Sequence, residues 1–417
     1  MQTGGFQSPA LAVIVCLLAL APEGSRADDV AVGSVRLRGG YDANPQLLPG
    51  GRGGAFAGVD AAFAMGRSDG GVDSALSGEL QRADYATRGL VPAQRAKITF
   101  DIQGDPFAGW TLKSQSSAES IDSATTRSFD AVQNLRLSAD GDGVRPFIVG
   151  ELRYSRLNET NAILTDFLPE DQRFIRATAI PGVKSSFGHG ELGVSVNVSA
   201  TRYETDPDLF GYRRRNERVQ PFLFYRAESD LADVSLSVSR LYGTWHDPDF
   251  SPVRALLFDL GLTLRSPDKH WQFEATGRRS AADTTFPISP LTISELYSGT
   301  LSYSEPDRWR IGATARWLRT AYLDSPFSSS ILSYGLTGNY QVNRDWSVGA
   351  DVLRIHAAVL NGERVDSVLA TLSLTRRFVW GEKKLGEKDK KAPAPEAAPL
   401  SAPTTAPTPS ASAAALY

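Results

Sequence analysis

The chain is poor in cysteine and in long apolar runs. Cys16 is the only cysteine among 417 residues, so the remainder has neither disulfides nor a thiolate zinc site. Beyond the amino-terminal segment no run of about 18 apolar residues occurs, which excludes a polytopic helical membrane protein. The net charge of −3 gives no overall electrostatic attraction to nucleic acid.

The composition is that of a folded chain. Apolar residues make up 41% of the sequence, too much for a protein that is disordered throughout. The mean hydropathy of −0.22 suits a soluble protein. It suits a transmembrane β-barrel equally well, because lipid-facing apolar residues there alternate with polar residues that face the lumen.

The two ends of the chain differ from its body. Residues 10–21 are apolar and are followed by Ser25-Arg26-Ala27, which predicts a secretory signal peptide over residues 1–27, although no Lys or Arg precedes the apolar core. Residues 381–417 are rich first in lysine and then in proline and alanine, which predicts a disordered periplasmic tail. The tail has either no partner or an anionic cell-wall polymer bound by its lysines, which are Lys383, Lys384, Lys388, Lys390 and Lys391.

From about Val32 to Trp380 apolar and polar residues alternate with a period of two, in segments of about 10–14 residues. This pattern is typical of strands with one apolar and one polar face. The connections between segments are alternately short and long, as in outer-membrane barrels. We therefore expect residues 28–380 to form an all-β, transmembrane, antiparallel up-and-down β-barrel. We count about 18 strands, with 16 as the fallback because residues 172–190 are difficult to divide, and an even count places both termini in the periplasm.

The seven tryptophans are expected near strand ends. Amphipathic rings concentrate at the two bilayer interfaces, whereas a soluble β-sandwich would bury them in the middle of its strands. Trp245 and Trp317 are expected to border long loops. The other five form the predicted interface girdle on the side of the short turns, namely Trp110, Trp271, Trp309, Trp346 and Trp380.

Two segments carry a resemblance to a known family. Gly40-Tyr41-Asp42-Ala43-Asn44-Pro45 is similar to the Gly-Tyr-Asp-x-Asn-Pro motif that follows the signal peptide in the β-barrel porin 2 family. Residues 372–380 resemble the aromatic-ended closing strand that the barrel-assembly machinery recognises, although here a tail follows it. The resemblance implies an integral barrel in the outer membrane of a Gram-negative bacterium, and some relatives are associated with exopolysaccharide production.

Charged residues lie on the polar faces of the predicted strands, with a slight cationic excess. They either pair across strands and fill the interior, or they line a water-filled channel and set its ion preference. The basic members are Lys97, Arg136, Arg153, Arg265, Arg278, Arg310 and Arg316, and the acidic members are Asp101, Glu151, Asp259, Glu274 and Asp351.

Other motifs have alternative interpretations. Glu204, Asp206 and Asp208 are a solvated turn or a calcium site. Arg213-Arg214-Arg215 is a solvated loop or a contact to lipopolysaccharide phosphates. Residues 50–54, Gly-Gly-Arg-Gly-Gly, are a flexible hairpin connection. The histidines, His189, His246, His270 and His356, show no nucleophile–base arrangement, so we expect no enzyme, no metal and no cofactor.

Three functions from different classes fit this sequence. The first is a porin-like channel for passive diffusion of small hydrophilic solutes or ions. The second is a barrel for exopolysaccharide secretion or surface assembly. The third is a non-conducting barrel whose loops bind a partner. In each case outer-membrane lipid, lipopolysaccharide and the barrel-assembly machinery are the expected partners, and nucleic acid is not.

Overall fold

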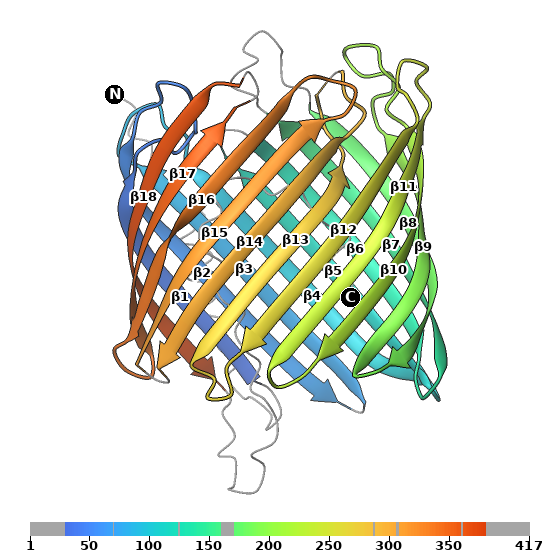
Figure 1. The fold of residues 1–417 in the computed structure, drawn as a ribbon, viewed down its shortest axis with the longest axis horizontal. Helices are drawn as coiled ribbons and strands as arrows, with labels where there is room; N and C mark the ends of the chain where they lie inside the picture. Colours follow the sequence, from blue (N-terminus) through green and yellow to red (C-terminus); the bar gives the residue numbers. More distant parts are fainter. Residues whose placement is uncertain are drawn as a thin grey trace, which may run out of the picture.

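The computed structural model describes residues 30–69, 71–123, 126–159, 171–286, 288–305, 308–359 and 362–380. They form one closed antiparallel sheet of 18 strands, in which β1 pairs with both β2 and β18 (Figure 1). The strands are β1 Val30–Asp42, β2 Gly54–Asp69, β3 Val72–Tyr85, β4 Ala93–Phe107, β5 Trp110–Asp122, β6 Thr126–Ala139, β7 Val144–Glu159, β8 Gln172–Phe187, β9 Gly190–Tyr203, β10 Asn216–Glu228, β11 Ala232–Trp245, β12 Val253–Arg265, β13 Trp271–Ala282, β14 Thr292–Glu305, β15 Trp309–Tyr322, β16 Ser328–Gln341, β17 Trp346–Ala358 and β18 Arg364–Trp380. Among the described residues, no helix has the length and apolarity that a membrane span requires.

The predicted fold class and the count of 18 strands are confirmed. The stretch that was difficult to divide is a single strand, β8, followed by a tight turn into β9. Apolar side chains lie on both of its faces: Phe174 and Ile180 are buried, whereas Ile175 and Val183 are exposed. Alternation is therefore weak there. The predicted signal peptide, most of the connection before β8, and the predicted tail lie outside the described residues.

The outer wall of the barrel is apolar. Leu336 and Leu372, in the middle of well-paired strands, are 63% and 67% exposed. Exposed apolar residues of this kind recur on alternate positions around the sheet, as Leu37, Ile98, Phe100, Leu152, Val198, Leu256, Ile311 and Val352. A closed sheet satisfies its backbone groups internally, and an apolar outer band matches a hydrocarbon environment. The chain is an integral β-barrel of the Gram-negative outer membrane.

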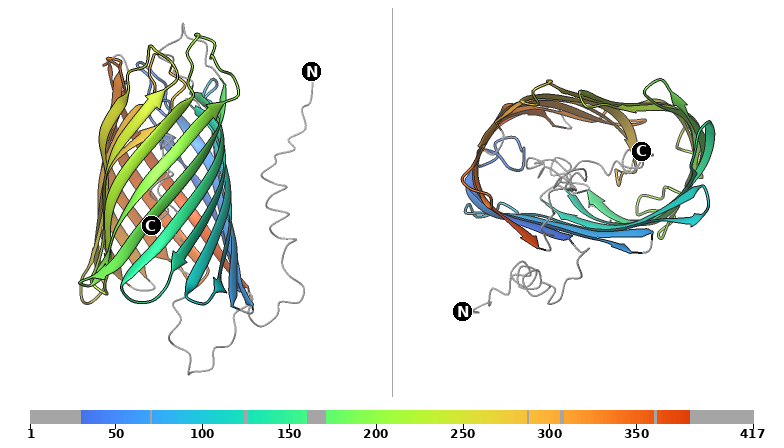
Figure 2. Two further views of the ribbon diagram at one scale, coloured as in Figure 1. Left: turned by 90° about the vertical axis from the view of Figure 1, so that its right-hand side faces the viewer. Right: turned by 90° about the horizontal axis from the view of Figure 1, so that it is seen from below.

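The cylinder is interrupted between β12 and β13. These strands share eight residue pairs, from Phe258↔Arg279 to Arg265↔Gln272, whereas β11–β12 and β13–β14 each share twelve. Beyond the Phe258↔Arg279 pair, residues 253–257 of β12 and 280–282 of β13 are not paired with one another. We call this stretch the seam. In the view from below in Figure 2, this part of the wall curls inside the outline of the barrel.

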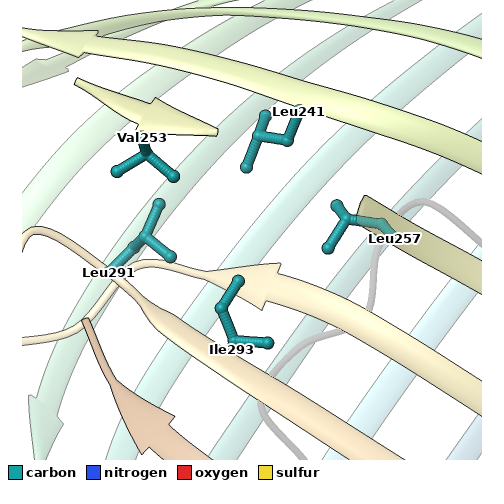
Figure 3. Packing of buried hydrophobic residues seen from close by; sticks show 5 residues of the cluster. All are labelled: Leu241, Val253, Leu257, Leu291 and Ile293. Atoms are coloured by element: carbon teal, nitrogen blue, oxygen red, sulfur yellow. The ribbon is translucent and has the colours of Figure 1, made fainter. Parts of the chain in front are cut away.

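An apolar cluster fills the overlap at the seam. Leu241, Val253 and Leu257, on the inner face of β11 and β12, pack against Leu291 and Ile293 from the end of the β13–β14 hairpin (Figure 3). By strand alternation Ile293 belongs to the outward face of β14, because Tyr297 and Leu301 on that face are exposed. The hairpin end has therefore moved inward and lies under β11 and β12.

Replacing Leu291 by Ala tests this packing. Leu291 is fully buried, so Leu291→Ala should lower the free energy of unfolding by about 2–5 kcal/mol through lost burial and a residual cavity. The measurement is urea unfolding of the protein refolded in vesicles. Leu231→Ala, in the exposed β10–β11 turn, is the control. Equal effects of the two variants would contradict the packing described here.

Candidate functional site

The lumen holds a cavity of about 570 Å³ against the inner wall of β6–β13, beside the inward hairpin. Its wall is rich in hydroxyl and amide side chains and contains equal numbers of basic and acidic residues. The basic ones are Arg153, Arg156, Arg176, Arg218, Arg226, Arg278 and Arg279, and the acidic ones are Asp130, Glu151, Glu228, Asp233, Asp259, Glu274 and Asp283. The slight cationic excess expected from the sequence does not hold for this cavity.

Asp283, directly after β13, ties the hairpin to the wall of β8–β10. Its carboxylate accepts hydrogen bonds from the guanidinium groups of Arg176 on β8 and Arg218 on β10. The Tyr203 hydroxyl of β9 donates to the same carboxylate at 3.3 Å. Two neighbours orient the arginines, since Arg176 donates to Thr201 Oγ1 at 3.0 Å and Arg218 to Asn216 Oδ1 at 2.9 Å.

Arg214, in the β9–β10 loop, binds the hairpin end a second time. Its guanidinium donates to the backbone carbonyl oxygens of Thr284 and Ser289, both at 3.1 Å, and of Phe286 at 2.9 Å. Its Nε donates to Asp208 Oδ2 at 2.7 Å, and both side chains are 2% exposed. A buried arginine with four oxygen acceptors fixes the path of the loop, because each buried acceptor would otherwise be left unpaired.

The other side of the hairpin end rests on β15 and the loop after it. The rings of Phe286 and Tyr322 lie 4.7 Å apart, and Phe327 packs edge-on against Phe286 at 5.4 Å. The Leu323 N–H donates to the Leu291 carbonyl oxygen at 3.0 Å. The hairpin end is thus fixed on two sides and narrows the lumen from within.

The twelve sequence-predicted lumen residues all lie on the side of their strands opposite the exposed apolar residues. Five of them line the cavity, namely Glu151, Arg153, Asp259, Glu274 and Arg278. The other seven lie elsewhere on the inner wall and are Lys97, Asp101, Arg136, Arg265, Arg310, Arg316 and Asp351.

Several of these charges bind a neighbouring strand. Arg278 Nε donates to Asp259 Oδ2 at 2.9 Å, and Arg265 pairs with Asp233 at 2.5 Å. Asp101 accepts from Gln115, and Arg310 donates to Ser302. Filling the interior and lining a channel are therefore not exclusive roles, and a role in conduction stays a prediction for all twelve.

Four charged residues hold the hairpin end. The sequence pattern does not single out Arg176, Arg218 or Asp283, and it marks Arg214 only as part of the Arg213-Arg214-Arg215 motif. Arg176 lies on the strand whose pattern was obscure. Arg218 shares its face with Phe222 and Phe224, so that face does not look polar. Asp283 lies in a loop, where periodicity carries no information.

The acidic and basic loop motifs have structural roles here. Asp208 holds Arg214 and accepts the backbone N–H groups of Phe210 and Tyr212, both at 2.9 Å. For Arg214 both interpretations of the arginine motif, a solvated loop and a lipopolysaccharide contact, are wrong, because its side chain is buried under the hairpin. Within the part of the chain that the structure describes, no group of three or more His, Cys, Asp or Glu side chains could hold a metal ion.

The motif that carried the family resemblance ties the first loop to the last strand. Asp42 Oδ1 accepts hydrogen bonds from the Asn44 N–H and from the Ser367 hydroxyl, both at 3.0 Å, and all three residues are buried. The Asn44 amide then donates to the Leu48 carbonyl oxygen at 2.8 Å. The motif supports closure of the barrel.

Most predicted tryptophan positions agree with the strand ends. Trp110, Trp271, Trp309 and Trp346 begin β5, β13, β15 and β17, and Trp380 ends β18. Two positions differ from their predicted surroundings. Trp245 ends β11 as expected, but its ring lies 5.5 Å from the Arg218 guanidinium on the lumen side. Trp317 lies five residues before the end of β15 and stacks on Tyr297 at 5.6 Å.

No known protein family matches this chain, and no curated protein matches it. Solved outer-membrane structures do match. The alcaligin outer membrane receptor FauA from Bordetella pertussis has 12% identity and a TM-score of 0.39 over 85% of this chain and 77% of its own. A ferric enterobactin receptor mutant (PfeA) from Pseudomonas aeruginosa has 9% identity and a TM-score of 0.46 over 84% of this chain and 81% of its own. The FrpB iron transporter from Neisseria meningitidis has 10% identity and a TM-score of 0.43 over 85% of this chain and 83% of its own. Likeness at this level assigns no ligand to the chain.

Proposed function

We propose that this barrel is a porin-like channel of the outer membrane for passive diffusion of small hydrophilic solutes or ions. The observation that carries the proposal is the polar, charge-balanced cavity beside a hairpin that is folded into the lumen and fixed there. Barrels of this strand number leave an aqueous interior unless something fills it. The hairpin end narrows that interior on one side, and charged rows along the wall would set ion preference. No enzymatic activity is expected.

A swelling assay tests the proposal. Vesicles that contain the refolded protein and a trapped polymer should swell in isotonic solutions of small sugars, at a rate that falls as the sugar becomes larger. Vesicles with the folded barrel that swell no faster than empty vesicles would contradict diffusion and favour the non-conducting alternative.

Secretion of a polysaccharide is a second candidate. The cavity wall presents hydroxyl and amide groups such as Asn197, Ser199, Gln220 and Ser239, together with the rings of Phe222 and Phe224, and this combination suits the polar edges and apolar faces of sugars. Deletion of the gene with measurement of secreted polysaccharide separates the two candidates, because only the secretion function predicts a loss.

Charge reversal on the inner wall tests the lining role of the predicted residues. Replacing Arg310 and Arg316 by Glu adds negative charge to the wall of β15, so the reversal potential in a potassium chloride gradient should shift toward that of potassium. Planar-bilayer recording measures it. An unchanged reversal potential would remove both residues from the solute path.

A further inference from the structure

We infer that the seam between β12 and β13 is a lateral portal, through which an uncharged amphiphile with one apolar chain and a hydroxylated head passes between the outer leaflet and the lumen cavity. This function goes beyond the aqueous path and uses a different route.

The seam reaches into the bilayer. A tilted strand needs about 9–11 residues to cross the hydrocarbon. Only eight residues of β12 are paired with β13, so the unpaired part of this edge begins at hydrocarbon depth. Leu256, inside that part, is 59% exposed on the outward face. An unpaired strand edge in lipid is costly and is otherwise avoided in membrane barrels.

The seam is closed by side chains instead of ladder hydrogen bonds. Its seal is the cluster of Leu241, Val253, Leu257, Leu291 and Ile293 shown in Figure 3. The hairpin end is held elsewhere, by Asp283 and by the Arg214 bonds to β13–β14 loop carbonyls. The upper part of β12 has no ladder pairs with β13 to break when it separates from the hairpin, and an apolar chain can replace the apolar contacts that are lost.

A continuous surface leads from the seam into the cavity. Leu241, Leu257 and Ala281 belong to the seal or pack against it, and all three also line the cavity. Arg279 also lines the cavity, although strand alternation assigns it to the outward face. Its side chain forms an ion pair with Glu295 at 3.0 Å, at the point where the pairing of β12 with β13 ends.

The cavity itself determines the class of amphiphile. The rings of Phe222 and Phe224 offer an apolar floor, whereas Ser235, Ser237 and Ser239 form a hydroxyl row on β11. The seven basic residues of the wall are matched by seven acidic ones, so no net charge attracts an ionic head. An uncharged, hydroxylated head on a single chain fits such a wall.

The test cross-links the two edges of the seam and measures whether a photoreactive probe in the membrane still reaches the cavity. In a Cys16→Ser background, Leu257→Cys with Ala281→Cys, whose side chains both lie at the apolar seal, is joined by bis-maleimidoethane, which holds the two edges of the seam together. The control is Leu262→Cys with Ala275→Cys, whose Cα atoms are partners in the paired part of the same strands. The probe is an alkyl glucoside with a diazirine in its chain, mixed into the vesicles, and adducts are mapped by mass spectrometry after illumination.

Adducts on cavity-lining peptides of β8–β11 should fall at least tenfold when the seam is pinned, and they should persist in the pinned control. Adducts that are unaffected by pinning, or that occur only on lipid-facing side chains of the unpinned protein, would overturn the portal. Ion conductance is recorded on the same samples. Conductance should persist after the seam is cross-linked. A loss of conductance would therefore concern the aqueous path, whereas a loss of adducts in the cavity concerns the portal.

Discussion

Arg214→Ala should release the inward hairpin and raise the single-channel conductance. The substitution leaves Asp208 Oδ2 and three loop carbonyl oxygens without the guanidinium group that now donates to them. Removing one partner of a fully buried ion pair typically costs about 3–5 kcal/mol. Because Arg214 donates three hydrogen bonds to the loop at the hairpin end, we expect the cost to appear as local detachment of that loop, with a wider and noisier channel, while the paired strands below remain folded.

The adjacent arginine supplies a matched control. The Arg213 side chain is exposed, and its contact with Asp247 is made by the backbone N–H at 2.6 Å, which Arg213→Ala keeps. Conductance should therefore change in Arg214→Ala and not in Arg213→Ala. Limited proteolysis should cleave the β13–β14 loop faster in Arg214→Ala than in Arg213→Ala or the unaltered protein. Equal conductance of Arg214→Ala and the unaltered protein would contradict the role of Arg214 in holding the hairpin end inside the lumen.

Asp283→Asn should make the channel prefer anions. The carboxylate now faces two guanidinium groups, those of Arg176 and Arg218, and the amide keeps its shape but loses its charge. The seven-to-seven balance of the cavity wall then becomes a cationic excess of one. Close charges in a partly desolvated site interact by several kcal/mol before screening by salt, so we expect the chloride-to-potassium permeability ratio to rise by at least about threefold.

Asp249→Asn is the control for Asp283→Asn, since it removes the same charge from the exposed loop between β11 and β12. The reversal potential in a potassium chloride gradient should move toward that of chloride in Asp283→Asn and stay unchanged in Asp249→Asn. A shift of the same size in both variants would mean that overall charge, and not the hairpin contact, determines selectivity.

The barrel could be predicted from sequence because its physical cause is local. Every second side chain of a strand meets lipid, and Leu192, Val194 and Val196 against Gly193, Ser195 and Asn197 show this directly. The pattern failed where both faces are apolar, as on β8. There the lumen face carries Phe174, whose ring lies 5.1 Å from that of Tyr203, and Ile180, which belongs to a buried apolar cluster with Val149.

The arrangement inside the barrel could not be predicted because its causes are distant in sequence. Asp283 meets Arg176 across 107 positions, and Arg214 meets Phe286 across 72. No period or spacing shows that a hairpin end will turn inward. The interrupted pairing of β12 with β13 is equally invisible, since Leu256, Phe258 and Leu260 alternate regularly through it. For the same reason Trp245, at a strand end as expected, was not foreseen as a lumen residue.

Single-channel recording in planar bilayers tests the central claim most directly, with a panel of salts and non-electrolyte polymers of increasing size. We predict stepwise openings with weak ion selectivity in the unaltered protein, and a cut-off in polymer size that becomes larger in Arg214→Ala. Correctly inserted, heat-modifiable barrels that give no conductance steps, with or without Arg214, would show that the lumen is closed and that the channel proposal is wrong.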